Sequence, residues 1–223
     1  MADRDAKTRL YESALDSMGR RGIAATSTRE ILKAAGIRNP SAISYHFGSK
    51  AGLVNELAKE LAGGQYPILS LQTKLAAADP LPTAEEWVRP VIDTSIELVS
   101  SERGCLLARL WWEFDGYLQP QSLERFVGGS DERAVEWRAA VATVFPDLPP
   151  QIGMARNVTM LRTVGWMVAR MAAISLASDP FPVRTHVRFR RWLTEIAVTL
   201  LSAPTNLIDE DVQLPPPATP RAG

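Results

Sequence analysis

Side chains that can bind nucleic acid are concentrated between Thr26 and Lys50, in the segment TSTREILKAAGIRNPSAISYHFGSK. Arg38 and Asn39 belong to residue types that pair with base edges. Arginine pairs with guanine O6 and N7, and asparagine pairs with adenine N6 and N7. The hydroxyl group of Thr28, at the start of a predicted helix, can hold a phosphate. The segment therefore predicts recognition of DNA rather than the making or breaking of bonds.

The elements that position these side chains follow from local signals. Apolar residues at helical spacing predict a first helix over about 4–20, which ends near Gly19 and Gly22. Ser27 is typical of a helix N-cap, and Glu30 three residues later completes a capping box. A second helix therefore begins at this point.

A tight turn and a third helix follow. Gly36 ends the second helix, since glycine accepts the left-handed conformation, and Pro40 suits the first turn of the third helix. Gly48 ends the third helix, and Ser49 caps a fourth. We expect Ala35, Ile43, Phe47 and Leu53 to lie in the core. The layout is that of a helix-turn-helix, whose second helix lies in the DNA major groove.

Charge is distributed unevenly along the chain, although the formal net charge is zero. Residues 1–50 carry nine Lys and Arg against five Asp and Glu, a net of +4, and the remaining residues carry sixteen against twenty, a net of −4. Binding of nucleic acid depends on the local field that faces the phosphates, so the basic N-terminal part is consistent with it.

Other functional classes find little support in the composition. The chain shows no nucleophile-elbow, P-loop or GxGxxG pattern, and with two histidines and one cysteine it shows no metal-ligand cluster. We expect no catalytic residue, no metal and no cofactor, and Cys105 among leucines predicts a buried thiol. The chain also lacks a signal-peptide pattern and a membrane span, and the single cysteine fits a reducing cytoplasm.

The motifs AAGI and SAISYHFGSKAGL, after a first helix and within a helix-turn-helix, resemble those of the tetracycline-repressor (TetR) family. The resemblance covers about residues 5–62 and implies a DNA-binding head. Arg38, Asn39 and Ser41 occupy the turn and the N-terminal end of the third helix, the end that meets base edges in such modules. Ser27 and Thr28 could hold a phosphate, and Arg29 could reach a phosphate or a groove edge. The equivalents of Tyr45, His46 and Lys50 in the family usually contact the DNA backbone, and Ser44 stands where many relatives have tyrosine.

Three of these residues also allow interpretations without DNA. Arg29 belongs to a helix face that could simply be solvated. Tyr45 could pack on the first helix, and His46 could be a packed, hydrogen-bonded histidine.

The rest of the chain is predicted to be helical, so the fold class is all-α. Gly63, Gly64 and Pro67 predict a boundary between a DNA-binding domain over 1–62 and a helical domain over 63–203, and a proline-rich tail follows over 204–223. Helical patterns lie near 83–101, 104–117, 120–145, 150–177 and 183–203. Strand-like alternation is absent from the sequence.

The resemblance implies a ligand pocket and a dimer in the C-terminal part. Broad apolar faces over 150–177 and 183–203 would pair with those of a second copy in an isologous four-helix interface, the alternative being intrachain core. Aromatic and arginine side chains form the candidate pocket: Arg109, Trp112, Phe114, Arg162, Trp166 and Arg170. The alternative for the arginines is an ion pair with Glu113 or Asp115.

We therefore predict a ligand-responsive homodimeric regulator. The resemblance favours a repressor that a small, mainly apolar molecule releases from a palindromic operator. A ligand-independent dimeric DNA-binding protein is one alternative, and an enzyme with an appended DNA-binding head is another.

Overall fold

The computed structural model describes residues 2–118, 132–178 and 186–204, and these ranges are all-helical without a strand. The helices are α1 (Ala2–Arg21), α2 (Thr28–Ala34), α3 (Ala42–Phe47), α4 (Lys50–Ala76), α5 (Ala84–Leu98), α6 (Glu102–Leu118), α8 (Glu132–Val144), α9 (Pro150–Leu176) and α10 (Val187–Ser202). Among the described residues, no helix is long and apolar enough to cross a membrane. The predicted all-α class is confirmed, and the tail beyond residue 204 lies outside the described residues.

Local signals place the helix ends around the turn correctly. The Ser27 hydroxyl accepts from the N–H of Glu30, and the Glu30 side chain accepts from the N–H of Ser27, which is the predicted capping box. Ser49 caps α4 by accepting from the N–H of Gly52, and Gly36 follows α2 with a φ of 66°. One detail was wrong: Pro40 precedes α3 rather than lying in its first turn, because Ser41 is the N-cap.

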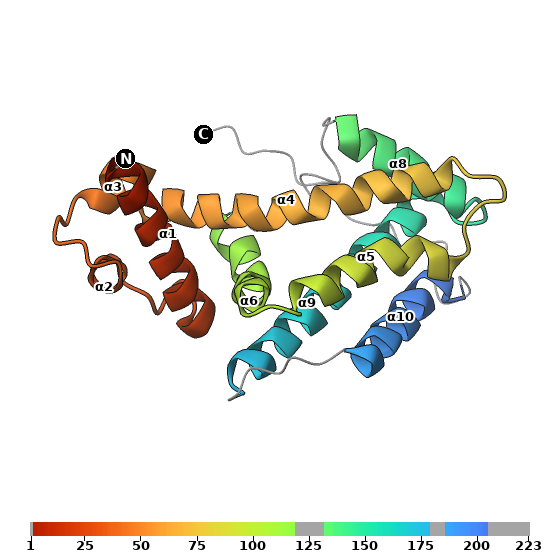
Figure 1. The fold of residues 1–223 in the computed structure, drawn as a ribbon. Helices are drawn as coiled ribbons and strands as arrows, with labels where there is room; N and C mark the ends of the chain where they lie inside the picture. The colour runs from red at the N-terminus through yellow and green to blue at the C-terminus, as the bar shows by residue number, and fades with distance from the viewer. Residues whose placement is uncertain (1, 119–131, 179–185, 205–223) are drawn as a thin grey trace.

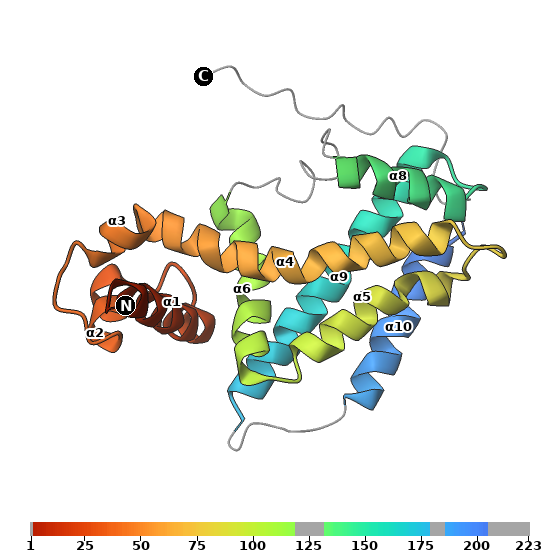
Figure 2. The same cartoon turned by 45° about the horizontal axis from the view of Figure 1, so that its top comes forward.

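The helix α4 runs without interruption past Gly63, Gly64 and Pro67, where the sequence predicts a break. Glycine and proline cost helix stability in isolation, but tertiary packing overrides propensity. Leu53 and Leu57 near one end of α4 and Ile68 near the other are buried in different clusters. Figures 1 and 2 show α4 extending along the molecule from α3 toward α8.

Two hydrophobic clusters divide the molecule. One packs α1, α2, α3 and the beginning of α4, which we call the head, around Leu10, Leu15 and Ile31. The other packs α5, α8, α9, α10 and the far part of α4, which we call the body, around Trp87 and Trp137. Helix α6 belongs to both, because its Leu106, Leu107 and Leu110 are buried in the head cluster and its Cys105 and Ala108 in the body cluster.

Candidate nucleic-acid interface

The helices α2 and α3 lie at the end of the molecule farthest from α8 and α10 (Figures 1 and 2). Their apolar residues face inward: Ile31 and Leu32 of α2 and Ala42 and Ile43 of α3 are buried against α1 and α4. Because a helix buries one face, the polar residues of both helices lie on the opposite, exposed side.

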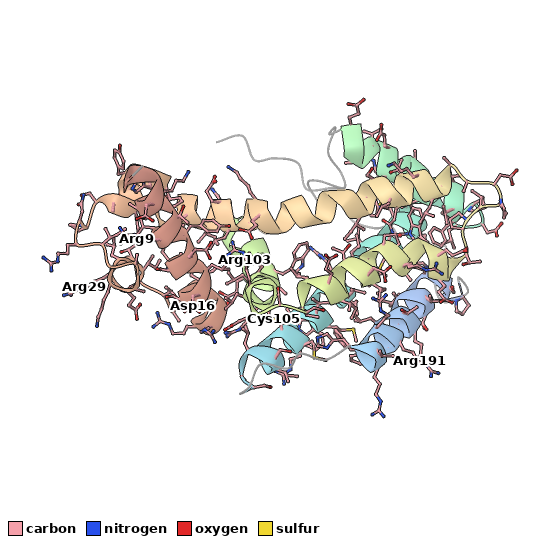
Figure 3. The ribbon with its side chains drawn as sticks, viewed as in Figure 1. Arg9, Asp16, Arg29, Arg103, Cys105 and Arg191 are labelled. Atoms are coloured by element: carbon pink, nitrogen blue, oxygen red, sulfur yellow. The ribbon has the colours of Figure 1, made fainter. Side chains whose placement is uncertain are left out.

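The start of α2 presents one engaged hydroxyl and two exposed polar side chains. The Ser27 hydroxyl donates to Glu30 at 2.8 Å and also accepts from the Glu30 N–H at 3.2 Å, so Ser27 is occupied with capping. Thr28 and Arg29 are exposed, and Figure 3 shows Arg29 directed away from the rest of the molecule. Thr28 and Arg29 are therefore better placed than Ser27 to meet a phosphate.

The carboxylate of Glu30 is charged and also takes part in the capping box of α2. The N–H of Ser27, the guanidinium of Arg21 and the hydroxyl of Ser27 all donate to its carboxylate, and together they lower the pKa of Glu30 to about 2. Hydrogen bonds to the charged form of a carboxyl favour that form. Glu30 is thus ionised at neutral pH and holds the first turn of α2 in place.

The turn between α2 and α3 exposes Arg38, Asn39 and Ser41 together. The Asn39 Oδ1 accepts a hydrogen bond from the N–H of Ser41 at 3.0 Å, so this side chain closes an Asx turn just ahead of α3. The amide N–H groups of Asn39 take no part in that bond, because its acceptor is the side-chain oxygen. The three residues predicted to contact bases thus lie at the N-terminal end of α3.

Tyr45 is the most exposed large hydrophobic side chain of the head, with 74% of its surface accessible. It does not pack on α1; its ring meets the edge of the His46 ring with centroids 4.9 Å apart. His46 is half-buried and also approaches the Phe47 ring, whereas Ser44 is exposed beside Tyr45. The predicted core positions Ala35, Ile43 and Leu53 are buried, and Phe47 packs against the head cluster.

Two basic side chains donate to backbone carbonyls of the head. The ammonium of Lys50 donates to the carbonyl of Ile23 at 2.6 Å, which leaves two of its three N–H donors for another partner. The guanidinium of Arg9 donates to the carbonyl of Ala35 at 3.2 Å, at the end of α2. Sequence reasoning missed Arg9, since no local signal links residues 26 positions apart.

The predicted ligand-pocket residues separate in the structure. The guanidinium of Arg109 donates to the carbonyls of Gly19 and Arg20 at the end of α1, toward the head. On α9, Arg162 is half-buried, and Trp166 and Arg170 are exposed. The side chains of Trp112 and Phe114 lie outside the described residues.

Glu113, the suggested ion-pair partner of Arg162 or Arg170, accepts a hydrogen bond from the N–H of Ile23 at 2.6 Å instead. The side chain of Asp115, the other suggested partner, lies outside the described residues. Cys105 is buried as predicted, and this burial raises the pKa of its thiol to about 11. The thiol is therefore protonated at neutral pH and unreactive.

A small pocket opens between α5, α6 and α9, with room of about 30 Å³. Its walls combine two hydroxyl side chains with apolar and aromatic ones: Thr94, Ser95, Leu98, Ala108, Trp111, Gly165 and Val168. None of the predicted pocket residues whose side chains are described lines it.

The helices α9 and α10 leave large apolar side chains uncovered. Trp166 and Ile174 on α9 are each 53% exposed, and Val187 and Trp192 on α10 are 65% and 50% exposed. The opposite sides of both helices are buried in the body, through Met160, Val164, Phe189, Leu193 and Ala197.

Comparisons with known proteins agree on the N-terminal part of the chain. Residues 10–57, which span α1 to the beginning of α4, match the family model described as bacterial regulatory proteins, tetR family. The chain is 33% identical over 87 residues to the "Probable HTH-type transcriptional regulator YttP" of Bacillus subtilis (strain 168). That alignment covers 39% of this chain and 41% of the relative, less than half the length of either.

Two solved structures are similar at 18% sequence identity. One is a protein of Mesorhizobium loti MAFF303099 assigned to the TetR family, with 90% of this chain and 97% of that chain covered at a TM-score of 0.45. The other is a protein of Streptomyces coelicolor A3(2) described as a transcriptional regulator, with 88% and 98% covered at a TM-score of 0.40.

Proposed function

We propose that the protein is a DNA-binding transcriptional regulator, because residues 10–57 match the family model of bacterial regulatory proteins, tetR family. The observation that carries the proposal is the exposed polar face of α2, the turn and α3 at one end of the molecule. This face buries its apolar residues inward and exposes basic, amide and hydroxyl groups outward, as binding to a duplex requires.

The proposed division of roles follows exposure and geometry. Arg38, Asn39 and Ser41, at the N-terminal end of α3, contact base edges in the major groove. The residues proposed to hold phosphates are Thr28, Arg29, Ser44, Tyr45, His46 and Lys50. Ser27 supports this surface through its capping bonds with Glu30 rather than by a contact of its own.

The protein is proposed to act as a homodimer through α9 and α10. Two heads must lie about 34–36 Å apart to read successive half-sites of a palindromic operator, so a single copy is insufficient. The uncovered Trp166, Ile174, Val187 and Trp192 supply apolar surface for a two-fold interface. The proposed units are a DNA-binding part over 1–62 and a regulatory part over 63–203.

A small, mainly apolar molecule is proposed to release the protein from its operator, as a repressor requires. The pocket between α5, α6 and α9 supports this, since α6 contributes side chains both to its wall and to the head cluster. A molecule that binds one arrangement of these helices better than another shifts the population toward it. The second candidate is a dimeric DNA-binding protein that needs no effector.

The proposal is tested by selecting fragments of the source genome that the purified protein binds, and by measuring affinity between 50 and 200 mM salt. We expect affinity to fall steeply with salt, and the double variant Arg29→Ala/Arg38→Ala to bind all fragments weakly. Arg89→Ala is the matched control, because Arg89 is an exposed arginine on α5, outside the head and outside α9 and α10. An affinity that does not change with salt would contradict the proposal. Equal losses of affinity in the double variant and in the control would contradict it as well. Release by apolar compounds then separates the two candidates.

A further inference from the structure

Two charged side chains of α6 hold the turn that follows α1. The Nη1 of Arg109 donates to the carbonyl of Gly19 at 2.8 Å and also to that of Arg20. One turn further along α6, the Oε2 of Glu113 accepts from the N–H of Ile23 at 2.6 Å. Both contacts join residues about 90 positions apart in the chain.

These bonds satisfy backbone groups that the turn leaves without a partner. The last carbonyls of a helix lack intrahelical donors, and a cation near them also complements the helix dipole. Arg109 meets both conditions at the end of α1. The carbonyl of Ile23 accepts from Lys50 at 2.6 Å, so α6 and α4 together bind both polar backbone groups of Ile23.

Glycines allow α6 to come this close. A Cβ on Gly19 would lie 2.7 Å from the Leu106 side chain and 3.0 Å from the Leu106 Cα, so α1 and α6 are in contact at this point. Gly22 has a φ of 98°, and a Cβ there would lie 2.9 Å from the Glu113 carboxylate. The segment Gly19–Ile23 is therefore shaped to receive the two side chains of α6.

The remaining polar contacts between α6 and the head have a different character. Arg103 pairs with Glu12 and Glu60, and Arg20 pairs with Glu102, but each of these side chains is at least one-third exposed. Exposed ion pairs contribute little because water replaces them. The bonds of Arg109 and Glu113 end on backbone atoms of the turn instead, and such bonds fix where the turn lies.

We propose that Arg109 and Glu113 are positioning residues for DNA binding: they hold the turn ahead of α2 against α6, and so set how α2 and α3 are presented to a duplex. Neither residue contacts DNA or an effector in this role. The inference rests on the proposed function for its consequence on DNA binding. The contacts of Arg109 and Glu113 with the turn, which we call the clamp, are defined without DNA. The inference assigns Arg109 a role other than that of a ligand-pocket residue.

The clamp is tested first without DNA, by amide hydrogen exchange at Ile23. In Glu113→Ala the exchange should quicken about tenfold or more, because the N–H loses a charged acceptor. In Glu113→Gln, whose Oε1 still accepts, it should stay near that of the wild type, as in the control Arg191→Ala. Unchanged exchange in Glu113→Ala would overturn the clamp. Should that variant fail to fold, Glu113→Asp, which retracts the carboxylate by one methylene, replaces it with the same expectation.

The consequence is tested on a fragment that the wild type binds, with no effector added. We expect Arg109→Ala and Glu113→Ala to lower affinity about tenfold while dimer content stays unchanged, and Arg109→Lys and Glu113→Gln to restore part of it. If Arg109 instead bound an effector, Arg109→Ala would keep full affinity and alter only release, which would overturn the positioning role. A wild type that binds no fragment refutes the proposed function, and the exchange at Ile23 still decides the clamp.

Discussion

The indole N–H of Trp87 donates a hydrogen bond to the Oδ1 of Asn157 at 2.8 Å, and both side chains are fully buried. Asn157 in turn donates to the carbonyl of Gly153 at 2.9 Å. On the other side, Gln72 donates to the Trp87 carbonyl at 2.9 Å and accepts from the indole of Trp137 at 2.8 Å. This satisfied polar network joins α4, α5, α8 and α9 inside the body.

Replacing Asn157 with alanine should therefore destabilise the body strongly. The substitution leaves the Trp87 N–H buried without an acceptor and opens a cavity, which together cost about 2–4 kcal/mol. Urea denaturation of Asn157→Ala measures the loss. Thr159→Ala, at an exposed position of the same helix, is the control and should change the unfolding free energy by less than about 0.5 kcal/mol. A loss of less than about 0.5 kcal/mol for Asn157→Ala would contradict a stabilising role for Asn157 in this network.

Substitutions of Asn39 should separate its local hydrogen bond from base recognition. Asn39→Ala removes the Oδ1 that accepts from the N–H of Ser41, so it should cost about 1 kcal/mol and also relax base preference at one operator position. Asn39→Asp keeps an acceptor for the Ser41 N–H but loses the amide donor that pairs with adenine N7. Its stability should match the wild type while its base preference changes. Selection from randomised operators and thermal unfolding together check this, and identical base preferences in all three proteins would exclude base recognition by Asn39.

Charges placed on the uncovered apolar side chains should prevent dimer formation. Ile174→Glu and Trp192→Glu each put a carboxylate at the centre of the proposed interface, where burial of an unpaired charge is unfavourable. Sedimentation at micromolar concentration should then report a monomer, with operator affinity lost as well. Val135→Glu on α8 is the matched control, because Val135 is 47% exposed outside α9 and α10. A wild type that sediments as a monomer would contradict the proposed interface.

The capping box of α2 should make stability depend on acid pH. The pKa of Glu30 is lowered from 4.5 to about 2 in the folded protein, so its stabilising contribution is fully present above about pH 5 and is lost as pH falls toward 2. Glu30→Gln keeps a capping acceptor but does not titrate. The difference in unfolding free energy between wild type and Glu30→Gln should therefore shrink between pH 5 and pH 2. Glu85→Gln, on the exposed start of α5, is the control, and a difference that does not vary with pH would contradict the assignment.

Much of the head was predictable because its signals are local. The capping box of Ser27 and Glu30, the turn glycine Gly36 and the cap at Ser49 each act within a few residues of one another. Such patterns depend on backbone geometry that a short segment determines for itself. The buried residues of α2 and α3 followed from helical periodicity for the same reason.

These local signals could not predict contacts between residues that lie far apart in the chain. The first helix ends where the glycines predict, at Arg21, but the close packing of Leu106 against Gly19 is visible only in the tertiary structure. Arg109 was assigned to a pocket, but its guanidinium is directed to the end of α1. The stretch from Gly63 to Pro67 was expected to interrupt a helix that packing on both sides keeps continuous.

The sequence by itself determined the helical class of this protein and the helix-turn-helix at its N-terminal end, because capping, turn chemistry and periodicity are properties of neighbouring residues. Only the tertiary structure decided that α6 belongs to both hydrophobic clusters and that its Arg109 and Glu113 bind the turn of Gly19–Ile23. Those contacts join backbone groups to side chains about 90 residues away, and any charged residue on a helix can meet such groups. Which one does so depends on how the helices cross, a geometry set by the packing of the whole chain.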